Sequence, residues 1–142
     1  MVDGNSIGAI GPGLCVLLSV GPTDDERVAE RFAQRIAALR IFRDHAGKMN
    51  LDVAAVGGSV LVVSQFTLHA NASRGHRPSF VGAGEPELAE RLYGVFCEVL
   101  RGGGLTVESG RFGADMEVAL VNEGPVTLVL SSGEPPWEAD AG

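Results

Sequence analysis

The sequence predicts an α+β fold in which two helices pack on a mostly antiparallel or mixed β-sheet. Two segments carry apolar residues at helical spacing, and shorter apolar segments rich in β-branched residues predict strands. The strands outnumber the helices and do not alternate regularly with them, which favours α+β over a regular βαβ arrangement. The length of 142 residues indicates one domain with a single core, which we expect to span residues 1–132.

The first strand and the first helix lie near the N-terminus. Gly11-Pro12-Gly13 indicates a turn, and the apolar run Leu14 to Val20 then predicts a buried strand. Pro22 and Thr23 mark a helix start, and the acidic residues that follow favour a helix N-terminus. The apolar residues that recur at helical spacing, and that we expect to face the core, are Val28, Phe32, Ile36 and Leu39.

The middle of the chain predicts a turn, a strand, a loop and a second helix. Asp44 to Lys48 contains turn residues, and Ser59 to Phe66 is an apolar, β-branched segment that predicts a strand. Arg74 to Val81 is expected to be a loop, because its glycine and proline disfavour regular structure. The second helix is predicted from Pro86 to Arg101, where a run of three glycines ends it. Its apolar face consists of Leu88, Leu92, Phe96 and Val99.

Three further strands are predicted in the C-terminal part of the chain. They span Leu105 to Ser109, Met116 to Val121 and Val126 to Ser131. Residues 133–142 are expected to form a disordered acidic tail.

The charge distribution bears on the class of partner. The net charge is −7, which does not favour RNA binding, but the basic residues are grouped. An ordinary solvated surface is the alternative interpretation of these groups. One group is Arg35, Arg40, Arg43 and Lys48, and the other is Arg74, His76 and Arg77.

The cysteines and the apolar runs bear on location. Cys15 and Cys97 lie inside apolar runs, so we expect buried, reduced thiols, although the sequence alone does not settle whether they pair. The apolar run Leu14 to Val20 is too short to span a membrane, and no secretory signal opens the chain. We therefore expect a cytoplasmic protein that does not act at a membrane.

Several kinds of catalytic site have no sequence signal here. The three histidines share no metal-ligand spacing, and no phosphate-binding loop of the Gly-x-x-x-x-Gly-Lys-Ser type occurs. We therefore expect no metal, no cofactor and no side-chain nucleophile.

Ser64-Gln65-Phe66-Thr67-Leu68 is the first segment that could carry chemistry. It lies where an apolar strand ends, so backbone N–H groups, hydroxyls and an amide are available together. Such donors can stabilise the oxyanion that forms when water attacks an ester. The alternative is a strand that ends in polar residues for solubility.

Asn122-Glu123-Gly124-Pro125-Val126-Thr127 is the second such segment. A Gly–Pro bond can be cis, although trans is the usual isomer, and a cis bond would align two carbonyl oxygens as acceptors. The alternative is a simple hairpin turn.

Together the two segments resemble the signature motifs of the D-aminoacyl-tRNA deacylase family. The resemblance covers nearly all of Ile7 to Ser131 and implies that family's fold, with a barrel-like sheet, and a homodimer. It implies hydrolysis of the ester between a D-amino acid, and possibly glycine, and the terminal adenosine of tRNA. Other segments that look like the family are Arg40-Ile41-Phe42, Gly47-Lys48-Met49-Asn50-Leu51, Arg77-Pro78-Ser79-Phe80 and Gly110 to Met116.

The resemblance also implies roles for individual residues. Gly124 and Pro125 would enter the partner subunit's pocket, bind the substrate amino group and exclude an L side chain. The residues that would line the ester as the catalytic set are Ser64, Gln65, Phe66 and Thr67. The residues that would shape the adenosine side are Met116, Phe112 and Gly113. The candidates for phosphate contacts on tRNA are Arg40, Arg43, Lys48, Arg74 and Arg77. The 2′-hydroxyl of tRNA would assist catalysis and distinguish RNA from DNA.

The chain departs from the family at its start. Family members usually begin with an additional strand bearing Gln-Arg-Val, whereas Met1-Val2-Asp3-Gly4 resembles the turn after that strand. We expect an assigned start that lies too far downstream rather than a shortened chain, because every other motif is intact. A shortened chain would expose a sheet edge. The alternative functions are a related editing domain, such as that of archaeal threonyl-tRNA synthetase, and an inactive dimeric RNA-binding module.

Overall fold

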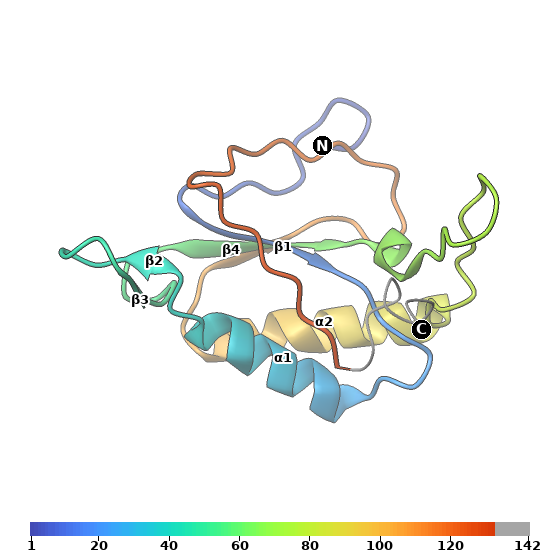
Figure 1. The fold of residues 1–142 in the computed structure, drawn as a ribbon, viewed down its shortest axis with the longest axis horizontal. Helices are drawn as coiled ribbons and strands as arrows, with labels where there is room; N and C mark the ends of the chain where they lie inside the picture. Colours follow the sequence, from blue (N-terminus) through green and yellow to red (C-terminus); the bar gives the residue numbers. More distant parts are fainter. Residues whose placement is uncertain (133–142) are drawn as a thin grey trace.

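The elements of the chain confirm an α+β fold. The structure, a computed structural model, describes residues 1–132, so the expected acidic tail at 133–142 lies outside the described residues. In chain order the elements are β1 (Gly13–Leu18), α1 (Glu26–Ala38), β2 (Phe42–Arg43), β3 (Met49–Leu51), β4 (Ser59–Ser64), the 3-10 helix η1 (Phe66–His69), α2 (Pro86–Gly102) and β5 (Val107–Ser109) (Figure 1).

The strands form a mixed arrangement. A three-stranded sheet in the order β1-β4-β5 has parallel neighbours, and β2 and β3 form a separate antiparallel ribbon. Each parallel pair is joined by a connection that contains a helix, as parallel strands require. The expected mixture of parallel and antiparallel pairing is therefore confirmed. A mostly antiparallel sheet is not observed, because only the β2–β3 ribbon is antiparallel. The described pairings leave the sheet open, so they do not show the barrel-like closure.

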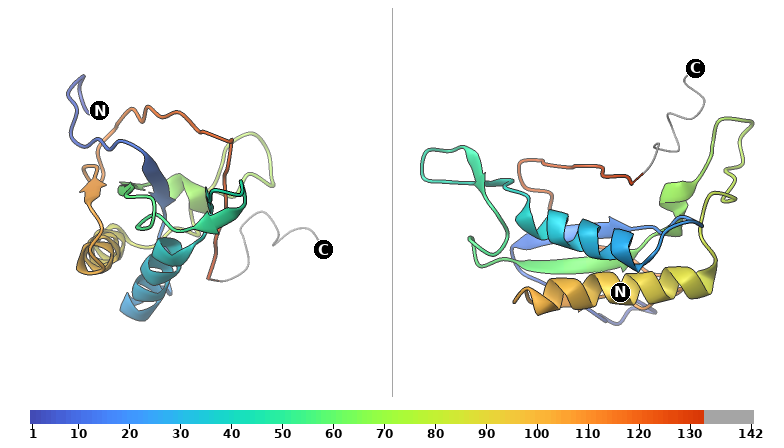
Figure 2. Two further views of the ribbon diagram at one scale, coloured as in Figure 1. Left: turned by 90° about the vertical axis from the view of Figure 1, so that its left-hand side faces the viewer. Right: turned by 90° about the horizontal axis from the view of Figure 1, so that it is seen from below.

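Both helices cover the same face of the three-stranded sheet (Figures 1 and 2). The side chain of Asp25 caps α1 by accepting a hydrogen bond from the Val28 N–H at 3.0 Å, and the helix begins after this cap rather than at Pro22. Helix α2 begins at Pro86, as predicted. From the predicted apolar faces, Phe96 belongs to the core, and Phe32, Ile36 and Val99 pack against it. The core consists of Ala33, Val53, Val60, Val62, Tyr93, Phe96, Cys97, Leu100 and Val107.

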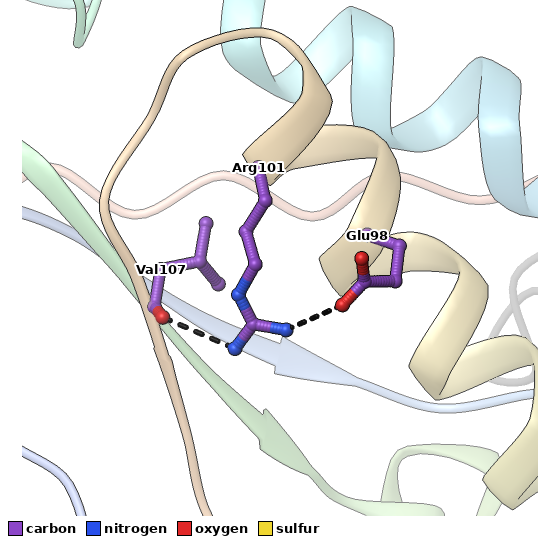
Figure 3. Close-up of polar contacts among 3 residues, drawn as sticks. All are labelled: Glu98, Arg101 and Val107. Carbon is purple, nitrogen blue, oxygen red and sulfur yellow. Dashed lines mark hydrogen bonds and ion pairs between the residues drawn. The ribbon is translucent and has the colours of Figure 1, made fainter.

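Two polar side chains of α2 tie that helix to the sheet. The Tyr93 hydroxyl donates to the Val62 carbonyl at 2.7 Å and accepts from the Gly110 N–H at 3.1 Å. The guanidinium of Arg101 donates to the Val107 carbonyl of β5 at 3.2 Å and to Glu98 at 2.9 Å (Figure 3). Strand β5 lies at the sheet edge, so these contacts hold it against α2 in addition to its ladder with β4.

Strand β1 is only half buried and ends at Leu18, so our prediction of a buried strand from Leu14 to Val20 was partly wrong. Leu14, Val16 and Leu18 pack against the core, whereas Cys15 and Leu17 are exposed on the opposite face. The cause is the two-residue period of a strand in a sheet with helices on one face. The predicted burial of Cys15 was therefore also wrong, whereas Cys97 is buried as expected, and both thiols are free.

The strands predicted at Met116 to Val121 and Val126 to Ser131 do not form in the described chain. Both segments have irregular backbone. Residues 116–121 lie on the sheet face opposite the helices, whereas residues 126–131 cross toward α1, where residues 129–132 help to line a cavity with β1, α1 and α2 (Figures 1 and 2). Alternating apolar residues suit a strand, but a strand needs another strand beside it. No strand among residues 1–132 pairs with these segments, and Met1 alone exchanges backbone hydrogen bonds with one of them, at Glu117. Their large apolar side chains are consequently exposed, with Val121 91% and Val129 66% accessible.

Candidate functional site

The Ser64 to Leu68 segment marks the point where β4 turns into η1. Ser64 is the last residue of β4, and the Gln65 N–H donates to the Leu18 carbonyl at 2.7 Å, which fixes where the turn begins. The predicted strand therefore ends two residues earlier than expected. Phe66 and Thr67 open η1, and N–H groups at the start of a helical turn have no acceptor within that turn. These two groups are the donors that this turn offers to a ligand.

The side chains of this turn are largely accessible. Phe66 is 57% exposed, and its ring meets that of Phe80 edge to face with 5.1 Å between centroids. The amide of Gln65 donates a hydrogen bond to the Thr67 hydroxyl. The turn therefore joins backbone donors, a hydroxyl and an aromatic pair on one surface, a combination suited to an ester linked to a base.

Ser19 and His69, which the sequence did not single out, lie beneath the same turn. The Ser19 hydroxyl donates to the Phe66 carbonyl at 3.4 Å and is hydrogen-bonded to Nδ1 of His69. A cavity of about 150 Å³ adjoins them, and its walls come from β1, α1, η1, α2 and residues 129–132. A histidine directly after Ser64-Gln65-Phe66-Thr67-Leu68, together with a serine after a strand, was the only sequence signal for this pair.

The segment Asn122 to Thr127 forms a bend with a cis Gly124–Pro125 bond. The Asn122 side chain accepts from the Val126 N–H at 3.1 Å and donates to the Thr127 hydroxyl at 2.8 Å. Gly124 has φ of +128°, and a Cβ there would lie 2.8 Å from a methyl group of Val126. The bend is not a hairpin turn between strands, because no strand flanks it among residues 1–132.

The two signature segments lie at opposite ends of the sheet in one chain. The bend of residues 122–127 lies at the end where β2 and β3 project, whereas η1 lies at the other end (Figures 1 and 2). A single chain therefore does not bring the cis bend to the donors of η1.

The predicted adenosine-side residues lie at the same end of the sheet as η1. Strands β4 and β5 are parallel, so the residues that follow them leave the sheet at the same end. Phe112 is partly buried, with its ring centroid 6.2 Å from that of Tyr93, and Gly113 is exposed with φ of +74°. The Met116 sulfur would lie 3.3 Å from a Cβ at Gly110, so Met116 packs over the start of this loop.

The candidate phosphate ligands are all exposed and fall into two groups. Arg43 lies on β2, Lys48 precedes β3, and the Arg40 guanidinium donates to the Asn50 side chain at 3.2 Å. Arg74 and Arg77 lie in the predicted loop, which follows η1. The first group therefore lies at the end of the sheet where the bend of residues 122–127 lies, and the second lies at the end where η1 lies (Figure 1).

Neither a cluster of metal ligands nor a helix suited to crossing a membrane occurs among residues 1–132. No three histidine, cysteine or acidic side chains lie close enough together there to hold a metal ion. Within the same range, neither helix combines the length and the apolar character that crossing a bilayer requires.

Comparisons with known proteins agree with the sequence motifs. The family model described as D-Tyr-tRNA(Tyr) deacylase matches residues 1–131. A D-aminoacyl-tRNA deacylase of Desulfatibacillum aliphaticivorans is 55% identical over 131 residues, covering 92% of this chain and 90% of that protein. The corresponding protein of Anaeromyxobacter dehalogenans is 57% identical, covering 92% of this chain and 88% of its own. Among solved structures, a c-Myc DNA unwinding element binding protein is 39% identical with a TM-score of 0.86, covering 94% of this chain and 91% of its own.

Proposed function

This chain belongs to the D-Tyr-tRNA(Tyr) deacylase family, and we propose that it is a hydrolase that cleaves the ester of D-aminoacyl-tRNA. The products are a free D-amino acid and tRNA, so the reaction serves translation quality control by proofreading the handedness of the amino acid. Glycyl-tRNA is a further substrate, because glycine has no side chain to exclude. The domain responsible spans residues 1–132.

The observation that carries this proposal is the start of η1 at the end of β4. Water attacks the ester carbonyl carbon, and the carbonyl oxygen gains a negative charge in the transition state. The N–H groups of Phe66 and Thr67 stabilise that charge, because they have no acceptor in their own turn. The ribose oxygen then leaves with a proton as tRNA, assisted by the neighbouring 2′-hydroxyl. Ser64 and Gln65 position the ester, and no side-chain nucleophile, metal ion or cofactor takes part.

Discrimination between D and L forms is assigned to the cis bend. The carbonyl oxygens of Gly124 and Pro125 accept hydrogen bonds from the substrate α-ammonium group, and the bend occupies the space that an L side chain would need. The bend lies far along the sheet from η1 in its own chain, so the bend that completes a site belongs to a partner subunit. We therefore propose a homodimer.

The exposed apolar side chains of residues 116–131 support the dimer. Leu120, Val121, Leu128 and Val129 are each more than half exposed. Exposed apolar patches on this scale are typical of interaction surfaces. A second copy that covers this segment would remove these side chains from water while carrying its own bend to the site.

The proposed partner is the aminoacylated 3′ end of tRNA, and the location is the cytoplasm. Phe112, Gly113 and Met116 follow β5 at the end of the sheet where η1 lies, and in this proposal they contact the terminal adenosine. The five basic side chains Arg40, Arg43, Lys48, Arg74 and Arg77 would contact tRNA phosphates. The role of the 2′-hydroxyl makes RNA rather than DNA the substrate. The free thiols of Cys15 and Cys97 suit a reducing compartment.

The test is the release of tyrosine from D-Tyr-tRNA and L-Tyr-tRNA by the purified protein, with and without a chelator. We expect hydrolysis of the D form alone, with no effect of the chelator. Gly124→Ala is expected to slow D-Tyr release by about tenfold or more, because the added methyl displaces Val126 and the acceptor oxygens. Gly57→Ala is the matched control, because Gly57 also has a positive φ but lies in another turn with open space around it.

The outcomes separate the parts of the proposal. Equal hydrolysis of both forms would refute chiral selection, and no hydrolysis would refute the enzyme and favour the inactive module. Loss of activity in Gly57→Ala to the same degree as in Gly124→Ala would refute the role of the bend. A monomer at the enzyme concentrations of the assay that is fully active would refute the composite site.

A further inference from the structure

Ser19 contacts both ends of the short helix that carries the proposed oxyanion donors. It lies just after β1, and its hydroxyl reaches the carbonyl of Phe66, the first residue of η1, at 3.4 Å. The same hydroxyl is hydrogen-bonded to Nδ1 of His69, the last residue of η1. One side chain from the segment after β1 therefore contacts both ends of the helical turn.

The proton count of Ser19 limits how its two hydrogen bonds can form together. The Phe66 carbonyl can only accept, and the Ser19 hydroxyl has one proton to donate. Both contacts of Ser19 are satisfied when its proton goes to Phe66 and His69 donates its Nδ1–H to the Ser19 oxygen. Nε2, the other ring nitrogen of His69, lies near Gly21 and Asp24. A Cβ added to Gly21 would be 3.4 Å from Nε2 and 3.4 Å from a carboxylate oxygen of Asp24.

The turn has little else to hold its shape. A single 3-10 turn has poor hydrogen-bond geometry and is weak in isolation. Its own bonds run from the Leu68 N–H to Gln65 and from the Ala70 N–H to Thr67. Phe66 is mostly exposed, so packing does not fix the peptide groups whose N–H donors matter. Among residues 1–132, the hydrogen bonds that hold the turn from outside are that of the Gln65 N–H to the Leu18 carbonyl and those of Ser19, and the Phe66 ring also contacts Phe80.

We propose that Ser19 and His69 are positioning residues, which clamp η1 so that the Phe66 and Thr67 N–H groups stay aimed at the substrate oxyanion. This role rests on the proposed deacylase function. It acts through backbone placement, and neither side chain touches the ester.

The kinetic test compares variants of the full chain on D-Tyr-tRNA. Ser19→Ala is expected to lower kcat by about tenfold or more and to leave KM unchanged, because oxyanion donors act in the transition state rather than on the bound ester. Ser19→Thr, which keeps the hydroxyl, restores kcat. His69→Asn keeps a polar atom near the position of Nδ1 and retains most of kcat, whereas His69→Phe does not. Ser73→Ala is the matched control, because its hydroxyl also bonds a side chain, that of Asn71, but does not reach η1.

A second measurement, hydrogen exchange, does not require the protein to be catalytically active. Hydrogen exchange at the Leu68 and Ala70 amides reports directly whether η1 is held. Both amides are expected to exchange about tenfold faster in Ser19→Ala than in wild type and at the wild-type rate in Ser73→Ala.

The two measurements distinguish failure of this inference from failure of the proposed function. Unchanged exchange in Ser19→Ala overturns the clamp, whatever the activity. Faster exchange with unchanged kcat, or a change in KM alone, overturns its link to catalysis. A wild-type protein that does not hydrolyse D-Tyr-tRNA overturns the proposed function and with it the catalytic role, and the exchange data then decide whether the clamp itself exists.

Discussion

Replacing Tyr93 by phenylalanine tests the central polar contact between α2 and the sheet. The hydroxyl is the only group removed, and it makes two hydrogen bonds, to the Val62 carbonyl and from the Gly110 N–H. The ring remains in the core beside Phe112. The change in the free energy of unfolding therefore reports the hydroxyl alone.

The size of the loss in Tyr93→Phe depends on which hydrogen bonds the Val62 carbonyl and the Gly110 N–H keep. The Gly110 N–H also donates to the Val62 carbonyl at 3.2 Å, so neither backbone group is left unpaired in the variant. The full desolvation cost of an orphaned buried group is thus avoided, and the loss is the net value of two ordinary hydrogen bonds, about 1–3 kcal/mol in total. For a chain of this size, each 1 kcal/mol lowers Tm by about 3–5 °C.

The assay is urea unfolding followed by circular dichroism, at one protein concentration for every variant. Ser6→Ala is the control, because it removes an exposed hydroxyl and is expected to change the free energy of unfolding by less than about 0.5 kcal/mol. A Tyr93→Phe variant that matches Ser6→Ala would refute the reasoning, because the hydroxyl would then have no net value. A loss above about 4 kcal/mol would also refute it, because that would require orphaned partners.

Two further predictions concern pH and the edge strand. Burial raises the pKa of Tyr93 above its usual 10.0 and that of Cys97 above 9.0, so the folded chain keeps protons that the unfolded chain loses. The free energy of unfolding is therefore expected to be constant to about pH 9 and to fall above it, less steeply in Tyr93→Phe, and equal slopes in urea titrations would contradict this. Arg101→Met keeps the aliphatic stem but removes the bond to the Val107 carbonyl, and is expected to cost about 0.5–1.5 kcal/mol, with faster hydrogen exchange in β5. Glu98→Gln, which weakens only the exposed ion pair, should cost less than about 0.5 kcal/mol, and an equal loss in both variants would assign the effect to the pair.

The helices could be predicted from sequence because their signals are local. The acidic cap and the apolar spacing of α1, and the proline and glycines that bound α2, lie within the elements themselves. Strand pairing is not local in this sense. The segments 116–121 and 126–131 have strand composition but no strand to pair with among residues 1–132, and the parallel order β1-β4-β5 depends on contacts between distant segments. The β2–β3 ribbon was missed because its strands are only two and three residues long.

The candidate site was predicted in part for the same reason. Its two signature segments are contiguous in sequence, so they could be recognised before their placement was known. Their separation along the sheet could not be read from the chain, because it depends on the course of residues 116–131. The Ser19–His69 contact joins residues 50 positions apart, and neither residue carries a motif of its own. The exposure of Cys15 was missed because an apolar run does not reveal that only one sheet face is covered by helices.

The two hydrogen bonds of the Asn122 side chain have a consequence for how the bend of residues 122–127 can act on another molecule. Both of its hydrogen bonds close within six residues, so the shape of the loop is set by its own neighbours and needs no outside support. A projection that is rigid before contact loses little conformational entropy when it docks. The loop can therefore select the groups that it contacts by their shape, without changing its own conformation.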